Sequence, residues 1–573
     1  MSFLLGCYGA GDGQAARAQL SRHLGASNDS SIQLSQQTDA ATFSVIAQRG
    51  VHLFVSQPNG AQRFALSVSG SPHQDDVWIE TSDTGLKLGR DAFGRATLFY
   101  AAQDGVVWFA TRLSLLLPLL PQKEFSLAGL SGYLSFSWTP APLTAVEGVS
   151  VVPAGSEVVW RGGSFETTRT QPWLTANEPL CDEAAAVAQL RALLEQSGGE
   201  LCADVRAETV GVFLSGGLDS SITAALLVRA GVKVRAYTLA FGDYGMSETP
   251  YAESVARHLQ IPLVKVDATP RRIRQALPAT ARALDQPYGD GVTVPLYLLN
   301  QAAANDVGIV FNGEGGDQLF AGWTNKPLIA AGVYESPEAF TAAYLRTFHR
   351  LHGYEAAVFT PALRAQLHSF SVTDWLADAL AAVPGSSLLS RLRRANLMLK
   401  GAQNIQPRAT NLALAHGLKL RTLFCSPALA AWTFGVSDEL FLRGACEKYL
   451  LKRAVEPWLP ADVVWREKRG MGAPLTAWCL GPLWRELGRW LNPARLDARG
   501  VFQSDLALRV ATGALSGHLQ GRRTGEILWL LLMWQVWQHE CFSDEAAPAR
   551  QTVYNPFWLP SQWWQFKQRL ANE

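Results

Sequence analysis

Apolar and polar positions follow three successive patterns along this chain. Up to about residue 174, short apolar runs alternate with polar positions and are separated by Gly, Asn and Asp, as in FSVIAQRGVHLFVS, RFALSVSG, GLKLGRD and VVWFATR. This pattern predicts β-strands joined by turns. After Thr209, strand-length apolar runs alternate with helical periods, as in TVGVFLSG, SSITAALLVRAG, KVRAYTLAFG, PYAESVARHL and PLVKVDA. That alternation predicts a parallel sheet covered by helices, and from about Lys326 onward the pattern is mainly helical.

The change of pattern divides the chain. At 573 residues it is too long for one hydrophobic core. The segment TANEPLCDEAAAV opens a long helical run that reaches Leu194, so we expect a β-rich domain over residues 1–178 and an α/β domain over residues 179–573. The most apolar late run, Ile527 to Trp537, is far shorter than the about 20 residues that cross a bilayer, and it predicts a core helix.

Composition narrows the classes of partner. Lys and Arg number 50 and Asp and Glu 49, so the net charge of +1 gives no electrostatic reason to expect a nucleic acid or a membrane as partner. The seven cysteines are scattered and form no CxxC, which signals neither a disulfide framework nor a zinc site. The start, MSFLLGCYGAGDG, lacks the basic region of a signal peptide. We therefore expect a cytoplasmic protein with reduced thiols.

The stretch VFLSGGLDSSITAALL carries the first candidate chemistry, because a buried strand there meets a helix through two glycines. Ligands of open α/β sheets bind beyond the carboxyl ends of strands. Gly216 and Gly217 allow the backbone to approach a ligand, and the following helix offers its first N–H groups to an anion. The three hydroxyls and the acid of this stretch suit phosphate and magnesium: Ser215, Ser220, Ser221 and Asp219. No Walker-type lysine follows, and an ordinary serine-capped turn is the simpler alternative.

A second glycine turn follows the apolar run in GIVFNGEGGDQLFAGW, and it holds Glu314 and Asp317. Asp219 and Asp317 lie at strand ends of one predicted sheet, so they could share one magnesium ion on a polyphosphate. The alternative is that Asp317 caps the next helix. A third, basic cluster runs from Arg443 to Leu475.

In this basic cluster Lys448 and Lys452 are four residues apart, which on a helix gives them one face. An exposed basic face is the common explanation for such spacing. A lysine turned inward would instead neutralise a leaving pyrophosphate.

These motifs, in this order, resemble those of the glutamine-dependent asparagine synthetases. RDAFGRATLFYA is similar to the family's RDxFGxxPLYY, FLSGGLDSS to its pyrophosphatase loop, and GEGGDQLFAGW to its GEGxDExFxGY. The late EKYLLKRAVEPWLPADVVWREKRGMGAPL is similar to KxxLRxAxxxxLPxxVxxRxKxGFxxP, and GYLSFSWTPAPLTAVEGVSVVPAGS to the segment that closes the N-terminal domain.

The resemblance implies an N-terminal-nucleophile-type sandwich followed by an ATP-pyrophosphatase-type α/β domain with a helical C-terminal part. It implies that ATP and Mg²⁺ adenylate a carboxylate, with release of pyrophosphate, before an amine attacks the acyl-AMP. Residue by residue, it implies that the loop from Ser215 to Ser221 holds the phosphates and that Asp219 and Asp317 hold the metal. It further implies catalytic roles for Glu314 and Lys448, and a nucleobase near Leu214, Leu239 and Gly313.

The chain departs from the family in both halves. The family's members that hydrolyse glutamine begin Met-Cys-Gly, whereas position 2 here is Ser2, Cys7 is internal, and no GEIYN is visible. We therefore expect a first domain without glutaminase activity. The family's DPS is replaced by Asp290 to Val292 (DGV), and GLExRxPFLD by Gly417 to Ser426 (GLKLRTLFCS), which keeps Arg421 but has Lys419 and Ser426 at the acidic positions. These segments are expected to shape or support the acceptor pocket, so free aspartate is a doubtful acceptor.

Three functions remain open at this stage. The first is a ligase that amidates a small-molecule or peptide carboxylate with ammonia or another amine. The second is intramolecular amide closure, as in the lasso-peptide macrolactam cyclases and β-lactam synthetases, which resemble the same scaffold and whose substrates bring their own amine. The third is a catalytically silent scaffold. A homodimer is compatible with all three.

Overall fold

The structure is a computed structural model. It describes residues 4–9, 31–37, 42–48, 52–56, 62–68, 75–82, 85–170, 179–244, 248–322, 337–348, 350–367, 370–381, 386–468, 470, 472–498, 500–515, 523–542, 547–548 and 555–572.

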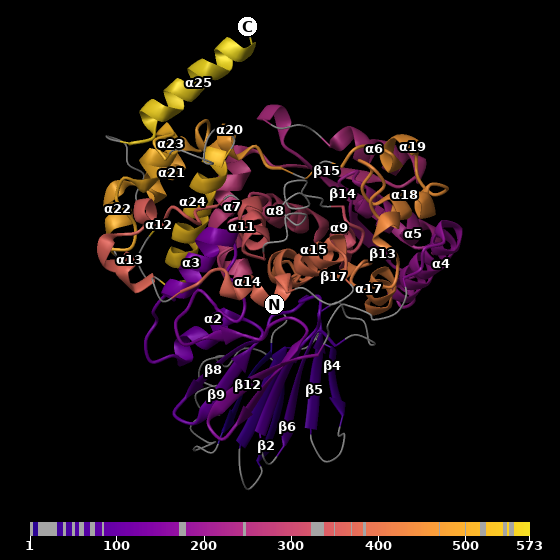
Figure 1. Cartoon of the computed structure of the whole chain (residues 1–573), viewed down its shortest axis with the longest axis horizontal. Helices are drawn as coiled ribbons and strands as arrows, with labels where there is room; N and C mark the ends of the chain where they lie inside the picture. The colour runs from indigo at the N-terminus through magenta and orange to yellow at the C-terminus, as the bar shows by residue number, and fades with distance from the viewer. Residues whose placement is uncertain are drawn as a thin grey trace.

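Residues 4–169 contribute two six-stranded antiparallel sheets, in the orders β10-β8-β9-β1-β3-β2 and β12-β11-β7-β6-β5-β4 (Figure 1). The β-rich prediction is therefore confirmed. The strands are β1 (Leu4–Gly9), β2 (Ser31–Gln37), β3 (Thr42–Gln48), β4 (His52–Ser56), β5 (Gln62–Ser67), β6 (Val77–Ser82), β7 (Gly85–Arg90), β8 (Phe99–Gln103), β9 (Val106–Ala110), β10 (Ser150–Val151), β11 (Ser156–Arg161) and β12 (Ser164–Arg169).

The two sheets pack on each other as a sandwich. Leu4 and Tyr8 of β1 belong to the same buried cluster as Val77 and Ile79 of β6 in the other sheet. Because side chains alternate across a strand, the intervening Leu5 and Cys7 face the opposite way. They join the large core formed with helix α3 (Leu127–Phe136) and the C-terminal helices. The sheet that contains β1 is thus covered on both faces.

A five-stranded parallel sheet forms the centre of the second half, in the order β15-β14-β13-β16-β17. Chain order reverses at β13, because later strands are added first on one side and then on the other. This switch point is where open α/β sheets bind ligands. The predicted alternation is confirmed. Its strands and covering helices are β13 (Thr209–Phe213), α5 (Leu218–Arg229), β14 (Lys233–Ala240), α6 (Thr249–His258), β15 (Leu263–Asp267), α7 (Pro270–Leu284), α8 (Thr293–Ala303), β16 (Ile309–Asn312), α16 (Gln406–Ala415) and β17 (Lys419–Thr422).

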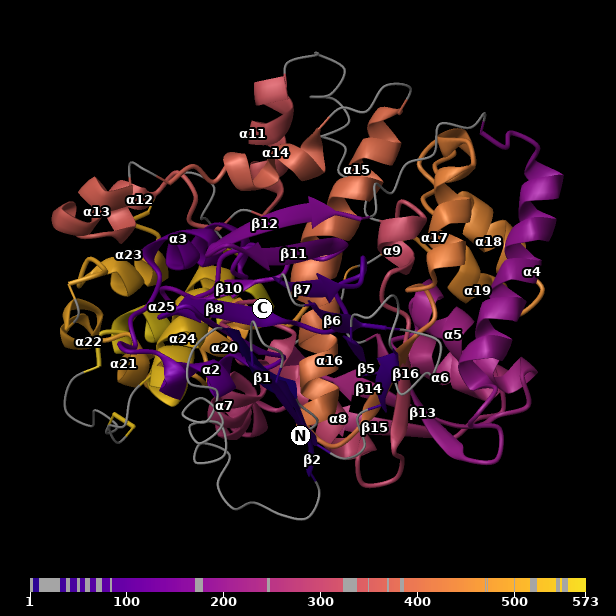
Figure 2. The same ribbon diagram turned by 90° about the horizontal axis from the view of Figure 1, so that it is seen from below.

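Helix α4 (Glu183–Cys202) is longer than the run predicted to Leu194. It continues through Gly198, where a Cβ atom would lie only 3.3 Å from Leu226 of α5, so the glycine permits close helix packing and does not end the helix. Figure 2 shows α4 beside α5 and α18 (Tyr449–Val455). The boundary expected between residues 178 and 179 stays a prediction, since residues 171–178 lie outside the described residues.

The remainder is mainly helical, as predicted. Helix α24 (Arg523–Phe542) contains the predicted core run, and its Trp529, Trp534 and Trp537 are almost fully buried. Among the described residues, no helix combines the length and the apolar character that crossing a membrane requires. The other helices after β16 are α9 (Gly316–Leu319), α11 (Pro337–Phe348), α12 (Glu355–Val358), α13 (Pro361–Leu367), α14 (Asp374–Leu380), α15 (Leu388–Asn396), the π-helical η4 (Leu397–Ile405), α17 (Pro427–Phe434), α19 (Ala461–Val464), α20 (Leu475–Cys479), α21 (Trp484–Trp490), α22 (Pro493–Asp497), α23 (Leu506–Thr512) and α25 (Trp558–Asn572).

Candidate active site

The loop between β13 and α5 forms the first wall of the site. Gly216 has a φ of +76°, and a Cβ atom there would lie 2.5 Å from the backbone nitrogen of Ala252, so both the backbone conformation and the space require glycine. The Oγ of Ser215 accepts a hydrogen bond from the Gly217 N–H at 3.2 Å and lies 3.1 Å from the Oγ of Ser220. Helix α5 begins directly after this turn, and a helix N-terminus favours an anion.

Two of the predicted phosphate-loop residues do not line the cavity. The buried Ser221 donates its hydroxyl to the Gly217 carbonyl oxygen at 2.8 Å, inside the first turn of α5. Gly216 likewise lies behind the cavity wall, which is formed here by Ser215, Gly217 and Asp219 together with Ser220. The contribution of Gly216 to a phosphate site is therefore conformational, and the phosphate contacts expected of Gly216 and Ser221 stay predictions.

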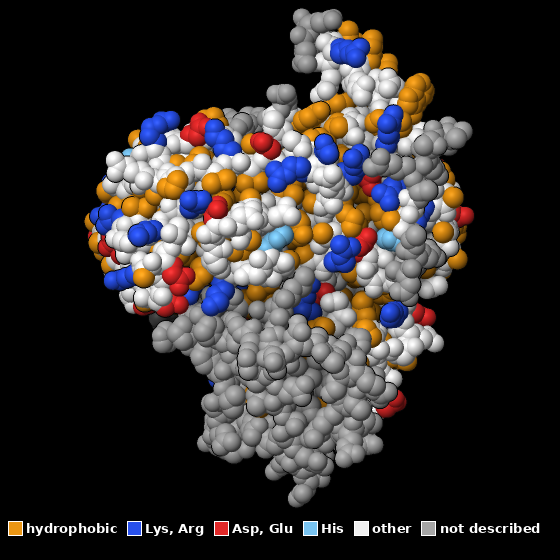
Figure 3. Space-filling view, turned by 180° about the vertical axis from the view of Figure 1, so that it is seen from behind, with side chains coloured by type: hydrophobic (Ala, Val, Ile, Leu, Met, Phe, Trp, Pro, Cys, Tyr) orange, Lys and Arg blue, Asp and Glu red, His pale blue; other side chains and the backbone are white. Residues whose placement is uncertain are grey.

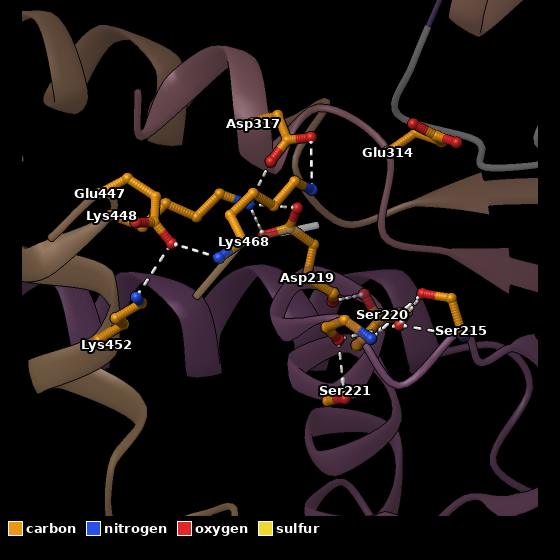
Figure 4. A network of polar contacts seen from close by, with 12 residues as sticks. Ser215, Asp219, Ser220, Ser221, Glu314, Asp317, Glu447, Lys448, Lys452 and Lys468 are labelled. Carbon is orange, nitrogen blue, oxygen red and sulfur yellow. Dashed lines mark hydrogen bonds and ion pairs between the residues drawn. The ribbon is translucent and has the colours of Figure 1, made fainter. Parts of the chain in front are cut away.

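A second turn follows β16, the strand next to β13. It places Glu314 after the strand and Asp317 in the first turn of the short helix α9. Asp317 and Asp219 face the same space from neighbouring strand ends (Figure 4). The sequence predicted this convergence, and the alternative in which Asp317 only caps a helix does not describe its contacts.

Lys448 joins the two acids. Its Nζ lies 2.6 and 2.5 Å from the two carboxylate oxygens of Asp219 and 2.5 Å from Oδ1 of Asp317 (Figure 4). A second lysine, Lys468, donates to Oδ2 of Asp317 at 2.8 Å. Two cations and two anions thus alternate at the carboxyl ends of β13 and β16.

The expectation that Lys448 and Lys452 share a helix face was wrong. Lys448 precedes α18 with a left-handed backbone, φ +55°, and this conformation turns its side chain into the site. Lys452, inside the helix, instead pairs with Glu447 at 3.1 Å. Both lysine side chains are buried, so the common explanation by an exposed basic face is excluded.

The charges set the protonation of the acids. Burial alone would raise the pKa of Asp317, but Lys448 and Lys468 outweigh burial and hold that pKa well below its usual value. Burial raises the pKa of Asp219, against the opposing charge of Lys448. Burial also raises the pKa of Glu314, with Arg408 opposing. Of the three acids, Asp317 is therefore the one that stays ionised most readily. Glu314, whose pKa is raised, is suited to accept and release a proton.

A cavity of about 1020 Å³ opens from this charge cluster, at the upper end of the range for small-molecule sites. The three residues expected near a nucleobase, Leu214, Leu239 and Gly313, all line it. The lining also combines apolar residues of α8 and α16 with charged side chains. These lining residues are Asp290, Val292, Leu296, Glu314, Lys400, Ile405, Arg408, Ala409 and Leu412.

Sequence reasoning missed several residues of this cavity, among them Lys468, Arg408 and Lys400. Lys468 lies in the quoted basic segment, at the lysine of the family's RxKxG, and this match was the available signal. Arg408 pairs with Asp290 at 2.8 Å, 118 positions away, and no local pattern announces such a pair. Lys400 reaches the wall from the π-helical η4, a type of segment that is often found at functional sites.

The two departures in the second half of the chain have different positions. Asp290 and Val292 of the DGV segment line the cavity, as expected for residues that shape an acceptor pocket. The 417–426 segment contributes no residue to the described cavity wall. Within it, Arg421 pairs with Asp204 at 2.6 and 2.7 Å, which ties β17 to the end of α4. That segment supports the fold and does not contact the cavity.

The N-terminal departures are only partly visible, because Ser2 lies outside the described residues. Cys7 lies in the middle of β1, opposite Ser44 of β3 and Trp108 of β9, with 1% of its surface exposed.

Residues Asp219 and Asp317 offer only oxygen ligands, which fits Mg²⁺. Their carboxylates already converge on one cation, the Lys448 ammonium. Within the described residues no group of three or more His, Cys, Asp or Glu side chains converges as a metal cage. Mg²⁺ commonly takes one or two protein carboxylates and completes its shell with phosphate and water oxygens, so this pair is sufficient.

Comparisons with known proteins place these features in a family. Residues 189–539 match the family described as asparagine synthase. A glutamine-hydrolyzing asparagine synthetase of Bacillus subtilis is 24% identical over 493 residues, which cover 80% of this chain and 76% of that protein. The amidase chyE of Penicillium rubens is 23% identical over 488 residues, covering 72% and 71%. An NH3-dependent NAD synthetase structure from Campylobacter jejuni aligns with 36% of this chain and 99% of its own at 15% identity and a TM-score of 0.18.

The matched segment contains every strand of the parallel sheet, both acid-bearing turns and Lys448. The chain belongs to the asparagine synthase family and is an ATP-dependent carbon–nitrogen ligase.

Proposed function

We propose that this ligase converts a carboxylate into its acyl adenylate and then transfers the acyl group to an amine. One observation carries the proposal: Asp219 and Asp317, from neighbouring strand ends, share Lys448 at the edge of a cavity large enough for a nucleotide and a second substrate. Adenylation benefits from such a cluster, because additional negative charge develops on the pyrophosphate as it leaves.

In the first step a carboxylate oxygen of the substrate attacks the α-phosphorus of ATP, and the bond from that phosphorus to the bridging oxygen of the β-phosphate breaks. Lys448 and Lys468 neutralise the charge that develops on pyrophosphate. The turn formed by Ser215, Gly217 and the start of α5 holds the phosphates. Bound Mg²⁺, held by Asp219 and Asp317, would supply a further positive charge to the phosphates.

In the second step the nitrogen of the amine attacks the acyl carbon, the bond to the adenylate oxygen breaks, and AMP leaves. The attacking nitrogen must lose a proton. Glu314 lines the cavity, and among the described residues no ion pair holds its carboxylate. Its raised pKa makes it the residue to receive that proton.

We further propose that the amine is ammonia or a substrate amine, and not nitrogen released from glutamine at Cys7. The thiol of Cys7 is buried in the core on the α3 side of the sheet, where it is closed off from a substrate. A cytoplasmic location with reduced thiols stays a prediction. Ring closure within one substrate and assembly as a homodimer stay predictions.

The test is carboxylate-dependent exchange of labelled pyrophosphate into ATP, with aspartate, other amino acids and peptides as carboxylates. We expect exchange with at least one of them and its abolition in Asp219→Ala. Asp497→Ala is the matched control, because Asp497 is an exposed acid outside the cavity. Exchange that survives Asp219→Ala, or amide formation that releases ADP and phosphate, would contradict the proposal.

A further inference from the structure

The C-terminal helix α25 carries an exposed apolar stripe. Leu559, Trp563, Phe566 and Leu570 are 71%, 59%, 52% and 58% exposed. Their spacing of four, three and four residues puts them on one line along the helix. The rings of Trp563 and Phe566 stack at 5.8 Å. Large apolar side chains exposed in a contiguous row mark a binding surface more often than a chance arrangement.

The stripe faces away from the rest of the protein. Ser561, on the other side of the helix, is fully buried, and Trp564 packs against the main core. Helix α25 contacts α21 and then projects from the rest of the protein (Figure 1). Figure 3 shows apolar and basic side chains on the projecting helix. No element in the described part of the chain covers the stripe.

Basic residues accompany the stripe. Lys567 lies with its Nζ 5.4 Å from the centre of the Trp563 ring, and Arg569 follows two positions later. On a helical projection these two residues lie on either side of the stripe. The helix contains no Asp or Glu between Trp558 and Asn572. The charged side chains within the helix are therefore all positive, with one acid, Glu573, directly after it, although the whole chain is almost neutral.

The charges on α25 indicate which kind of partner binds the apolar stripe. A second copy of α25 would bring like charges together. The stripe covers less than two heptads, short of the three to four that a coiled coil needs. A membrane surface with anionic lipids complements both features. Tryptophan rings lie at the headgroup level of a bilayer, and Lys and Arg beside an apolar helix face bind lipid phosphates.

We propose that α25 lies in the surface of a membrane containing anionic lipid and holds the ligase there peripherally, with Leu559, Trp563, Phe566 and Leu570 inserted and Lys567 and Arg569 at the headgroups. The helix does not span the bilayer: at 15 residues it is about 22 Å long, shorter than the hydrocarbon core. This surface is independent of the proposed reaction, because it lies outside the cavity.

The test is co-sedimentation of the full chain with vesicles of phosphatidylcholine alone or of phosphatidylcholine mixed with phosphatidylglycerol. We expect sedimentation with the anionic vesicles, weaker binding to the neutral ones, and release as salt is raised. Lys567→Gln with Arg569→Gln should lower the partition coefficient roughly 30-fold, because each basic residue at such a surface contributes about 1 kcal/mol. Trp563→Ser with Phe566→Ser should abolish binding at any salt concentration.

The matched controls are Phe370→Ser and the pair Lys123→Gln with Arg206→Gln, which change exposed residues elsewhere and should leave sedimentation unchanged. Circular dichroism and pyrophosphate exchange should not differ between the α25 variants and the wild type. Absence of sedimentation with anionic vesicles overturns the proposal. If the chain is then a dimer that Trp563→Ser with Phe566→Ser converts to monomer, the occupant is a second copy.

Discussion

Lys448 owes its position to one unusual backbone conformation. With φ at +55° it occupies a region that lysine rarely adopts, and the strain directs its side chain toward Asp219 and Asp317. Gly322 makes room for it, since a Cβ atom there would lie 1.8 Å from the Cε of Lys448. A strained backbone and an obligatory glycine converge on one ammonium group, which identifies that group as the centre of the site.

Replacing Lys448 should therefore affect chemistry more than folding. In Lys448→Asn the left-handed backbone is retained, because asparagine tolerates it, and the ammonium is lost. We expect carboxylate-dependent pyrophosphate exchange to fall by about 10²- to 10³-fold, the usual effect of removing one preorganised charge or donor. Lys419→Asn, outside the cavity, should keep wild-type exchange. Wild-type exchange in Lys448→Asn would show that the leaving group does not use this lysine.

The pair of Asp290 and Arg408 predicts a pH-dependent stability. Burial would raise the pKa of Asp290, but Arg408 and other cations outweigh it and hold that pKa far below its usual value. Folding therefore favours the ionised acid. The stabilisation is fully present above the unfolded-state pKa of about 3.9 and is lost as the pH falls toward the folded-state value.

Asp290→Asn should consequently lower the free energy of unfolding by about 1–2 kcal/mol at pH 7, and the difference from wild type should shrink at about pH 3. Urea midpoints at the two pH values measure this. A gap that stays constant between them would mean that the carboxylate charge does not stabilise the fold.

Elements with strong periodicity were predicted well, and the reasons are local. The sequence predicted the strand-turn-helix units around Asp219 and Asp317, because the apolar run, the glycines and the helical period are adjacent in the chain. Contacts between distant segments were not predictable. Arg408 meets Asp290 and Arg421 meets Asp204 across 118 and 217 positions, and no pattern in one segment specifies the other. The start of α18 one residue after Lys448 depended on a backbone conformation that lysine does not signal.

Helix α24 shows how an apolar run of this kind contributes to stability. Trp534 is 1% exposed and lies 5.5 Å from the ring of Tyr133, whose hydroxyl donates to the Leu530 carbonyl oxygen at 2.7 Å. Trp534→Ala should lower the free energy of unfolding by about 3–5 kcal/mol, because it leaves a large cavity where the sandwich half meets the helix. Trp558→Ala, which alters a half-exposed ring, should change it by no more than about 0.5 kcal/mol. Equal urea midpoints for both variants would mean that α24 is not the core element that its burial indicates.

Buried polar contacts join the β-sandwich to the α/β part of the molecule. Arg112 pairs with Asp285 at 2.7 Å, and Arg90 donates to the Ala402 carbonyl oxygen of η4 at 3.2 Å. The segment that receives Arg90 also supplies Lys400 to the cavity wall. The sandwich therefore buttresses the segment that supplies Lys400 to the cavity wall, whether or not it has an activity of its own. The net charge of the whole chain does not describe the distribution of charge along it. The net charge of +1 gave no electrostatic reason to expect a membrane partner, whereas α25 carries two basic residues and no acid between Trp558 and Asn572.

If the sandwich only supports the fold and has no glutaminase activity, the amide nitrogen should come from ammonia or a substrate amine and not from glutamine. The thiol of Cys7 points into the core between the sheet and α3, so reaching it would require opening the pairing of β1 with β3 and β9. Cys7→Ala should leave amide formation with ammonium, measured as AMP release in the presence of the accepted carboxylate, within about twofold of wild type, because removing one sulfur from a packed core costs little. With L-glutamine as the nitrogen source, glutamate release should be the same in Cys7→Ala and wild type.

Glutamate release that disappears in Cys7→Ala would mean that β1 opens to admit glutamine. Release that persists in Cys7→Ala but disappears in Ser2→Ala would assign the hydrolysis to residue 2, and either result would make the sandwich a working domain and refute its purely supporting role.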